Sequence, residues 1–130
     1  MDRDRRLEAF LAPAPDLRGT WSFRLRMNGT EPAQPRMLIA FSGKKKSGAT
    51  RMLEDPASEY WRDWIGADGV YESTAEGRLN MDIWHRDNRS YDFYSDSLDM
   101  NDFSGTYALN SESDPSSIYA RGTWTANRVE

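Results

Sequence analysis

The single histidine of the chain, His85, is the side chain best suited to acid–base chemistry near neutral pH. It lies at the end of a predicted strand, in Trp84-His85-Arg86-Asp87, and the carboxylates of Asp82 and Asp92 are close to it in sequence. No serine or cysteine motif for nucleophilic catalysis accompanies it, and the chain contains no cysteine. We therefore interpret His85 as a solvated turn residue and predict no catalytic set. An enzyme that uses Asp82, His85 or Asp92 inside the fold stays open as an alternative.

Two charged runs are the next candidates for chemistry. Asp96, Asp99 and Asp102 recur at every third position, whereas a calcium loop needs ligands at alternate positions, a central glycine and a closing glutamate. We interpret Ser95–Asp102 as a solvated acidic loop and predict no metal site and no cofactor. The basic run Lys44-Lys45-Lys46 lies in a predicted turn. There it either keeps a sheet edge soluble or makes a weak contact with an anion or an acidic partner.

Three large rings stand close together at Tyr60, Trp61 and Trp64. We favour a strand for this segment, and a strand would direct Tyr60 and Trp64 to one side and Trp61 to the other. One face would then expose a large ring, which is typical of a contact surface for a protein partner or a second copy of the chain. The alternative is a second small core under a loop.

The elements that position these residues are predicted to be β-strands. Residues 19–27 alternate strictly between apolar and polar side chains, which is the pattern of a strand with one buried face, and the turn dipeptide Asn28-Gly29 follows. Further strands are predicted at 36–42, 49–53, 60–65, 70–73, 78–84, 90–94, 103–109 and 117–127. No helix-spaced apolar stripe occurs after residue 11, so a parallel sheet is not expected. The sequence predicts an all-β fold, a single antiparallel meander barrel of about eight strands.

The start of the chain differs from the rest. Residues 3–11 are predicted to form a short helix, with Asp2 as its N-cap and Pro13 beyond its end. We expect one barrel domain over residues 1–130, in which residues 1–16 form a helical or irregular N-terminal segment.

One local pattern, glycine–threonine–aromatic, occurs at Gly19-Thr20-Trp21, Gly105-Thr106-Tyr107 and Gly122-Thr123-Trp124. The opening Leu17-Arg18-Gly19-Thr20-Trp21 and the final hairpin that carries the other two copies resemble the calycin group, the lipocalin-like and avidin-like barrels. The resemblance implies a barrel with a cavity, and an arginine near the end of the last strand that packs over the tryptophan of the first. Arg128 is the first candidate for that role, and Arg121 is the second. If the first and last strands pair antiparallel, Trp21 and Arg128 can also meet on geometric grounds alone, and a guanidinium over an indole is a favourable contact.

Composition narrows the classes of partner. The net charge is −4, and the basic residues are scattered apart from the lysine run, which is not the pattern of a nucleic-acid-binding surface. The charged start is followed by no long apolar stretch, so we expect no signal peptide and no membrane span. These features favour a cytoplasmic protein, with an exported mature form left open.

The leading functional prediction is a non-catalytic barrel that binds a small apolar ligand. The inward-facing residues predicted to contact it are Phe23, Leu25, Phe41, Met81, Tyr107 and Trp124. Glycine and alanine on the last two strands, at Gly105, Gly122, Ala120 and Ala126, remove bulk from one wall and favour a cavity there. The alternative is a filled barrel that acts as a protein-interaction or inhibitor module through the aromatic cluster at Tyr60, Trp61 and Trp64.

Overall fold

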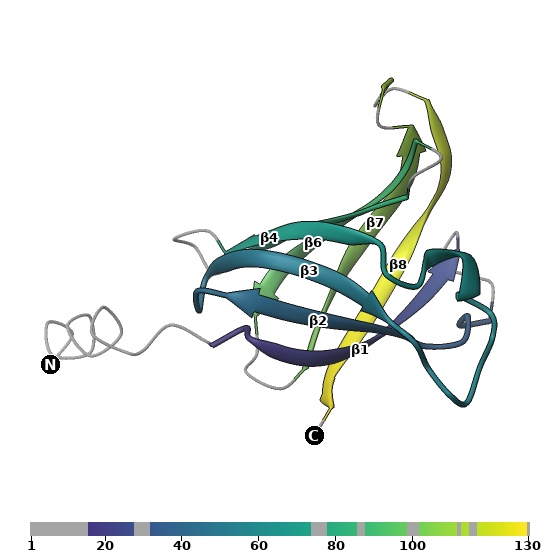
Figure 1. Cartoon of the computed structure of the whole chain (residues 1–130). Coiled ribbons are helices and arrows are strands. Elements are labelled where there is room, and N and C mark those ends of the chain that lie inside the picture. Colours follow the sequence, from purple (N-terminus) through teal and green to yellow (C-terminus); the bar gives the residue numbers. More distant parts are fainter. Residues whose placement is uncertain are drawn as a thin grey trace, which may run out of the picture.

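The protein is a closed antiparallel barrel in which each strand pairs with the next and the last pairs with the first (Figure 1). This computed structural model describes residues 16–27, 32–73, 78–85, 88–98, 102–111, 113–114 and 117–129. The strands are β1 (Gly19–Met27), β2 (Met37–Gly43), β3 (Ser47–Leu53), β4 (Asp68–Ser73), β5 (Leu79–Trp84), β6 (Arg89–Leu98), β7 (Asp102–Ser111) and β8 (Ile118–Val129). Eight strands leave an interior that side chains can just fill. No helix in the described part of the chain is long and apolar enough to span a membrane.

Most predicted strands are confirmed, with shifts of a few residues at their ends. Two predictions are wrong. Residues 60–65 do not form a strand: they belong to a long connection that contains the short 3-10 helix η1 (Arg62–Trp64). The predicted acidic loop Ser95–Asp102 is mostly strand, because β6 continues to Leu98 past an irregularity between Ser95 and Ser97, and β7 begins at Asp102. The predicted helix at 3–11 lies outside the described residues.

The closing strand pair carries the predicted tryptophan–arginine contact. In the β1–β8 register Trp21 faces Arg128, and the Arg128 guanidinium lies 4.4 Å from the centre of the Trp21 ring. Arg128 also donates hydrogen bonds to the carbonyl oxygens of Arg18 (2.8 Å) and Asp16 (2.6 Å), and the Trp21 indole donates to that of Leu17 (2.9 Å). These bonds fasten the incoming chain across this end of the barrel, which we call the closed end.

The barrel interior is packed with rings. Phe23 contacts three other aromatic side chains, with centroid distances of 5.1 Å to Trp124, 5.3 Å to Phe93 and 6.2 Å to Phe41. All four side chains are almost fully buried. These distances are typical of close aromatic packing, so this part of the interior is a filled core.

At two positions of the wall where a cavity was expected, Gly105 and Gly122, neighbouring backbone occupies the space. A Cβ on Gly105 would overlap the carbonyl oxygen of Tyr94, and one on Gly122 would overlap that of Arg26 and lie 2.7 Å from Cε1 of Tyr107. The two glycines allow neighbouring backbone to come close in a tightly coiled sheet. The space that these two missing side chains would fill is therefore already taken.

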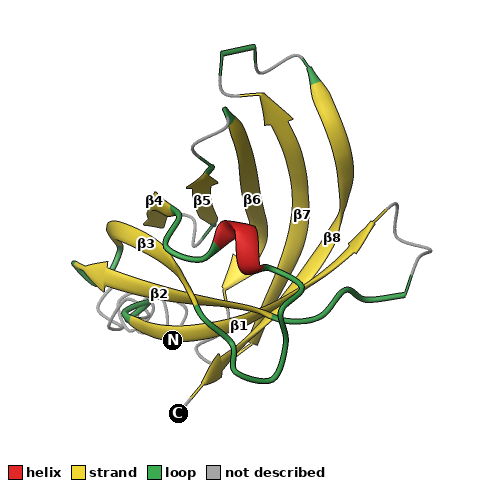
Figure 2. Cartoon of the chain, turned by 45° about the vertical axis from the view of Figure 1, so that its right-hand side comes forward, coloured by secondary structure: helices red, strands yellow, loops and turns green. Residues whose placement is uncertain are grey.

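At the opposite end, which we call the mouth, β1 ends and the connections β1–β2, β3–β4, β5–β6 and β7–β8 lie together. Figure 2 shows η1 lying across this end, within the connection between β3 and β4. The β7–β8 hairpin rises beyond the rest of the rim (Figures 1 and 2). The mouth is therefore the end of the barrel whose covering is built from a long loop.

Candidate functional site: the lidded mouth of the barrel

The β3–β4 connection, residues 54–67, acts as a lid on the mouth. Two of its rings point inward: Trp61 is 8% exposed and Trp64 is 6% exposed, and both belong to the hydrophobic core. The predicted strand is wrong, and neither tryptophan is exposed; the alternative of a second small core does not hold either, because both rings join the main core of the barrel. A loop that carries two tryptophans gains enough apolar burial to hold itself against the barrel. Tyr60 alone of the cluster is exposed, at 55%.

Side-chain contacts to the rim fasten the lid. The Trp61 indole donates a hydrogen bond to the carbonyl oxygen of Pro35 at 2.7 Å. His85 donates from Nε2 to the carbonyl oxygen of Asp63 at 2.8 Å, and its ring packs against Trp64 with centroids 4.7 Å apart. His85 is thus half-buried and holds the lid, which corrects its interpretation as a solvated turn residue.

An ion pair fixes the start of the lid. Arg36, just before β2, donates to both carboxylate oxygens of Asp55 at 2.8 and 3.2 Å, and Asp55 also accepts a hydrogen bond from the backbone of Ala57. Hydrogen bonding to Arg36 is the main cause that lowers the pKa of the Asp55 carboxyl below its usual value. The side chain of Asp55 is almost fully buried, so this pair ties the lid to the strand beside it.

Beneath the lid, two tyrosines face the interior of the mouth. Tyr91 on β6 and Tyr107 on β7 are 7% and 3% exposed, and their ring centroids are 5.8 Å apart. Trp61 and Trp64 cover Tyr91 at 5.9 and 4.8 Å. Burial is the main cause that raises the pKa of both tyrosines, so both hydroxyls stay protonated.

The opposite side of the mouth is less densely covered. Met27, Leu109, Ala120 and Gly122 share the inward parity of the core but are only half-buried, and they pair across the strands as Met27 with Gly122 and Leu109 with Ala120. Near Met27, Gln34 donates its backbone N–H to Leu25, while its side-chain oxygen is buried without a hydrogen-bond partner. This side of the mouth thus has small side chains at Ala120 and Gly122, and Gln34 carries a buried acceptor without a partner.

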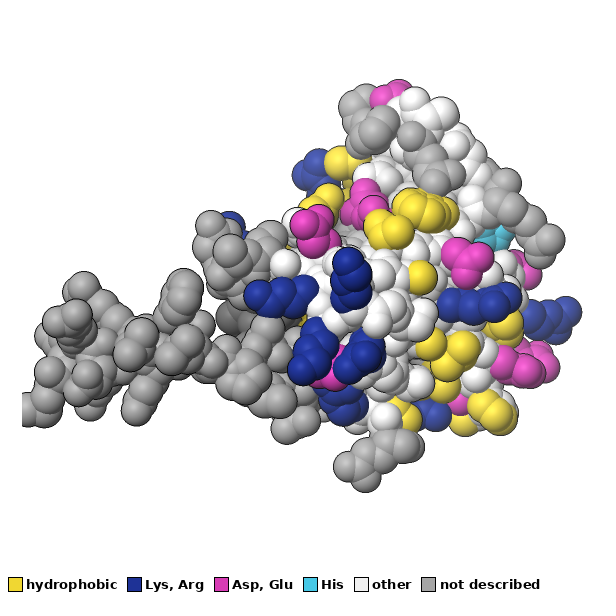
Figure 3. Space-filling model, turned by 60° about the vertical axis from the view of Figure 1, so that its left-hand side comes forward, with side chains coloured by type: hydrophobic (Ala, Val, Ile, Leu, Met, Phe, Trp, Pro, Cys, Tyr) yellow, Lys and Arg dark blue, Asp and Glu magenta, His cyan; other side chains and the backbone are white. Residues whose placement is uncertain are grey.

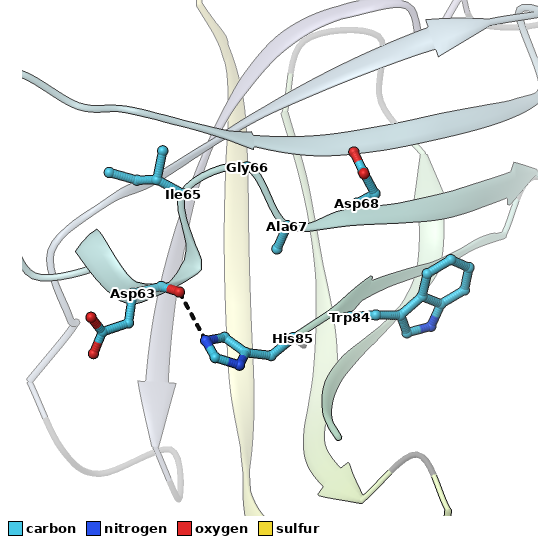
Figure 4. A pocket seen from close by; sticks show the side chains of 7 residues that line it. All are labelled: Asp63, Ile65, Gly66, Ala67, Asp68, Trp84 and His85. Atoms are coloured by element: carbon cyan, nitrogen blue, oxygen red, sulfur yellow. Dashed lines mark hydrogen bonds between the residues drawn. The ribbon is translucent and has the colours of Figure 1, made fainter. Parts of the chain in front are cut away.

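The lid also creates a hollow on the outer surface. A space of about 480 Å³ lies between its second half and the ends of β4 and β5, lined by Asp63, Ile65, Gly66, Ala67, Asp68, Trp84 and His85 (Figure 4). In Figure 4 the carboxylate of Asp63 points away from His85, and the dashed bond from His85 ends on the Asp63 backbone. The charged groups do not converge on one point, so this hollow is a groove beside the lid rather than a formed reaction centre.

The acid–base constellation considered in the sequence does not assemble. Asp82 and Asp92 are paired across β5 and β6, with the parity opposite to the buried residues, and therefore lie on the outer face. Asp92 accepts hydrogen bonds from Ser90 and Asn110 at 2.9 and 2.8 Å. His85 is turned to the lid instead. No group of metal-binding side chains occurs in the described ranges, and the side chains of Asp96, Asp99 and Asp102 lie outside them.

The lysine run lies at the closed end, in the turn between β2 and β3. Figure 3 shows Lys and Arg side chains gathered on this face. The carbonyl oxygens of Lys44, Lys45 and Lys46 accept hydrogen bonds from the Tyr71 hydroxyl, the Leu17 N–H and the Ser73 N–H respectively. These hydrogen bonds fix the backbone of the turn, and its three lysine side chains are exposed to solvent.

The predicted ligand-contact residues fall into two groups. Tyr107 lies at the mouth, whereas Phe23, Leu25, Phe41, Met81 and Trp124 are packed in the core. Sequence reasoning did not identify Tyr91 or Gln34 as site residues. Tyr91 carried a usable signal, since it shares the inward parity of Phe93 on the predicted strand 90–94, but nothing local in the sequence marks Gln34.

Comparison with known proteins shows the fold. One solved structure, described as a redesigned beta barrel (b11L5F_LGL), is 12% identical, covers 90% of this chain and 95% of its own, and has a TM-score of 0.61. A second, described as EF1p2_mFAP2b bound to DFHBI, is 10% identical, covers 88% and 94% of the two chains, and has a TM-score of 0.58. No protein-family model and no curated protein sequence matches the chain. At 12% and 10% identity, these two structures support the barrel fold, and they do not confirm the resemblance to the calycin group.

Proposed function

We propose that this protein is a non-catalytic barrel that binds a small, mostly apolar molecule at its mouth, between the lid and the β7–β8 wall. The observation that carries the proposal is the group of buried rings under the lid, where Trp61 and Trp64 cover Tyr91 and Tyr107 lies beside it. The buried side-chain oxygen of Gln34, which has no hydrogen-bond partner, costs about 1–3 kcal/mol, and a polar group of a ligand can recover that free energy. Aromatic walls with a few polar groups are the usual lining of a small-molecule site.

The lid allows entry without disturbing the core. Its rings cover the mouth, but they belong to a loop, and loops open locally at lower free energy than the strands beneath them. A ligand that moves Trp61 outward would take over the apolar contacts with Tyr91. The similar barrel bound to DFHBI is consistent with such a use of this fold.

Two neighbouring substitutions test the proposal. Ala120 points into the mouth and Arg121 points outward on the same strand. We expect Ala120→Phe to fill the less covered side of the mouth and to abolish binding, while Arg121→Phe leaves binding unchanged. Intrinsic tryptophan fluorescence, titrated with a panel of apolar and aromatic compounds, measures the effect. Equal binding by both variants, or no saturable change with any compound on the unmodified protein, would refute the mouth as a binding site.

A second candidate function, a protein-interaction module, is favoured by a different observation. The outer face of β6–β8 has a hollow of about 410 Å³ lined by Tyr94, Thr106, Tyr107, Ala108, Arg121, Gly122 and Thr123. Tyr94 is 49% exposed, and Tyr119 on the same face of β8 is 62% exposed. Exposed tyrosines are frequent at protein contact surfaces. Sedimentation of Tyr94→Ser and Tyr119→Ser variants tests self-association, which this alternative expects to weaken.

A further inference from the structure

The outer face of β6, β7 and β8 suits a second copy of this chain, an inference that rests on the second candidate function and is independent of ligand binding at the mouth. We propose that two copies pack face to face across a twofold axis parallel to β7, so that Arg121 of each copy meets Asp92 of the other. Two features of this face support the arrangement: a row of charges that crosses the sheet, and the hollow beside it.

The charges lie in one row across the outer face. The row consists of successive register partners on β5, β6, β7 and β8: Asp82, Asp92, Ala108 and Arg121. Asp82 and Asp92 are directly opposite each other, and like charges in that position repel. Arg121 is exposed, lies two strands or about 10 Å from Asp92, and makes no ion pair with any described residue. The row therefore has a negative end and a positive end that a single chain leaves apart.

A twofold axis turns this row end for end. With the axis above Ala108 and parallel to β7, strand β8 of one copy lies over β6 of the second copy. Arg121 then faces Asp92 of the second copy, and the symmetry repeats the same contact on the other side of the axis. Packed sheets are about 10 Å apart, a gap that an arginine and an aspartate side chain bridge from the two sides. The incoming guanidinium also offsets part of the repulsion between Asp82 and Asp92.

The hollow gives the same arrangement a steric fit. Tyr94, Thr106 and Thr123 form the next row of register partners, and the twofold axis places Tyr94 of each copy over Thr123 of the other. Thr123 lines the hollow of about 410 Å³, where the neighbouring Ala108 and Gly122 are also small. Tyr94 is 49% exposed in the single chain, and tyrosine is enriched at protein interfaces. Each copy therefore offers both a projecting ring and a hollow that can receive one.

The proposed contact is small. It involves three strands about 4.8 Å apart on each copy, which is a narrower surface than that of permanent dimers. We therefore expect a reversible dimer that forms at high protein concentration.

Charge reversal tests the arrangement by sedimentation velocity of the full chain, from about 10 µM to about 1 mM. The sedimentation coefficient of the unmodified protein should rise with concentration. Arg121→Glu puts a carboxylate opposite Asp92 of the second copy, and Asp92→Lys puts an ammonium group opposite Arg121, so each variant should dimerise at least about tenfold more weakly. In an equimolar mixture of the two variants, the introduced glutamate faces the introduced lysine, and the original pair forms on the other side of the axis. The mixture should therefore associate about as tightly as the unmodified protein.

Arg51→Glu is the matched control. It makes the same change of charge at an exposed position of β3, four strands from β7 in the closed order of the barrel, and it should sediment like the unmodified protein. Circular dichroism checks the fold of every variant. Asp92→Lys loses the hydrogen bonds from Ser90 and Asn110, and if it fails to fold, Asp82→Lys at the neighbouring position of the row replaces it in the mixture.

The outcomes separate this inference from the two candidate functions. A mixture that associates no better than its components overturns the arrangement, and so does an Arg121→Glu variant that dimerises as tightly as the unmodified protein. If Tyr94→Ser weakens association in that case, the interaction module stands with a different contact. An unmodified protein that stays monomeric over the whole range overturns both the inference and the self-association on which it rests. Binding at the mouth is measured separately by the Ala120→Phe titration, and it depends on neither charge.

Discussion

The contact between Trp21 and Arg128 should stabilise the closed end of the barrel by an amount that can be measured. Trp21 is fully buried and makes a 2.9 Å hydrogen bond to Leu17, so Trp21→Ala removes a large core side chain and leaves a carbonyl oxygen without its donor. Truncations of this kind cost about 3–5 kcal/mol. With an unfolding entropy of about 2.1 cal/mol/K per residue over the 130 residues, the melting temperature should fall by about 11–18 °C.

A double-mutant cycle measures how much of this loss of stability comes from the contact between Trp21 and Arg128. The Arg128 guanidinium lies 4.4 Å from the Trp21 ring and is half-buried, so the cation–π contact should contribute about 1 kcal/mol. Urea unfolding of Trp21→Leu, Arg128→Ala and the double variant measures this coupling, and Trp21→Leu keeps an apolar side chain so that the protein stays folded. Arg24→Ala, on the outer face of the same strand, serves as the uncoupled control.

The result that would refute the reasoning is a coupling no larger than the control. Distant, independent sites are additive within about 0.3–0.5 kcal/mol. A Trp21–Arg128 coupling inside that range would mean that Arg128 contributes only through its bonds to the carbonyl oxygens of Asp16 and Arg18.

Three further predictions concern the lid and the coiled wall. Trp61→Ser should lower the free energy of unfolding by about 2–4 kcal/mol, because a buried ring and its hydrogen bond are lost; an unchanged urea midpoint would show that the lid does not pack in solution. Asp55→Asn should cost stability that is fully present above about pH 4, the ordinary carboxyl range, because Arg36 lowers the folded-state pKa of Asp55. As pH falls through that lowered pKa, the difference from the unmodified protein should shrink, and a constant difference in urea titrations from pH 7 to 3 would argue against the ion pair. Gly105→Ala should destabilise the barrel, since the new methyl group would overlap the Tyr94 carbonyl, and a thermal melt that is unchanged would contradict that close approach.

The sequence by itself determined the strands and the way in which they close. Alternation in residues 19–27 specified which face of β1 is buried, because a strand has a side-chain period of two and one face must meet the core. The same logic placed Trp21 at the start of the first strand and Arg128 at the end of the last, so their meeting followed once the two strands were taken to pair. Both results follow from the local alternation of apolar and polar residues, together with the assumption that the first and last strands pair.

Only the tertiary structure decided where the lid goes and what the glycines do. Residues 60–65 have the composition of an aromatic strand, but Trp61 and Trp64 find their burial against Tyr91 on β6, a contact between segments distant in sequence that no local pattern encodes. Gly122 could equally have left a cavity or admitted the backbone of a neighbouring strand, and the choice depends on how tightly β8 coils against β1. The candidate site is the product of those long-range contacts, because Trp61 and Trp64 come from the lid, Tyr91 from β6 and Tyr107 from β7.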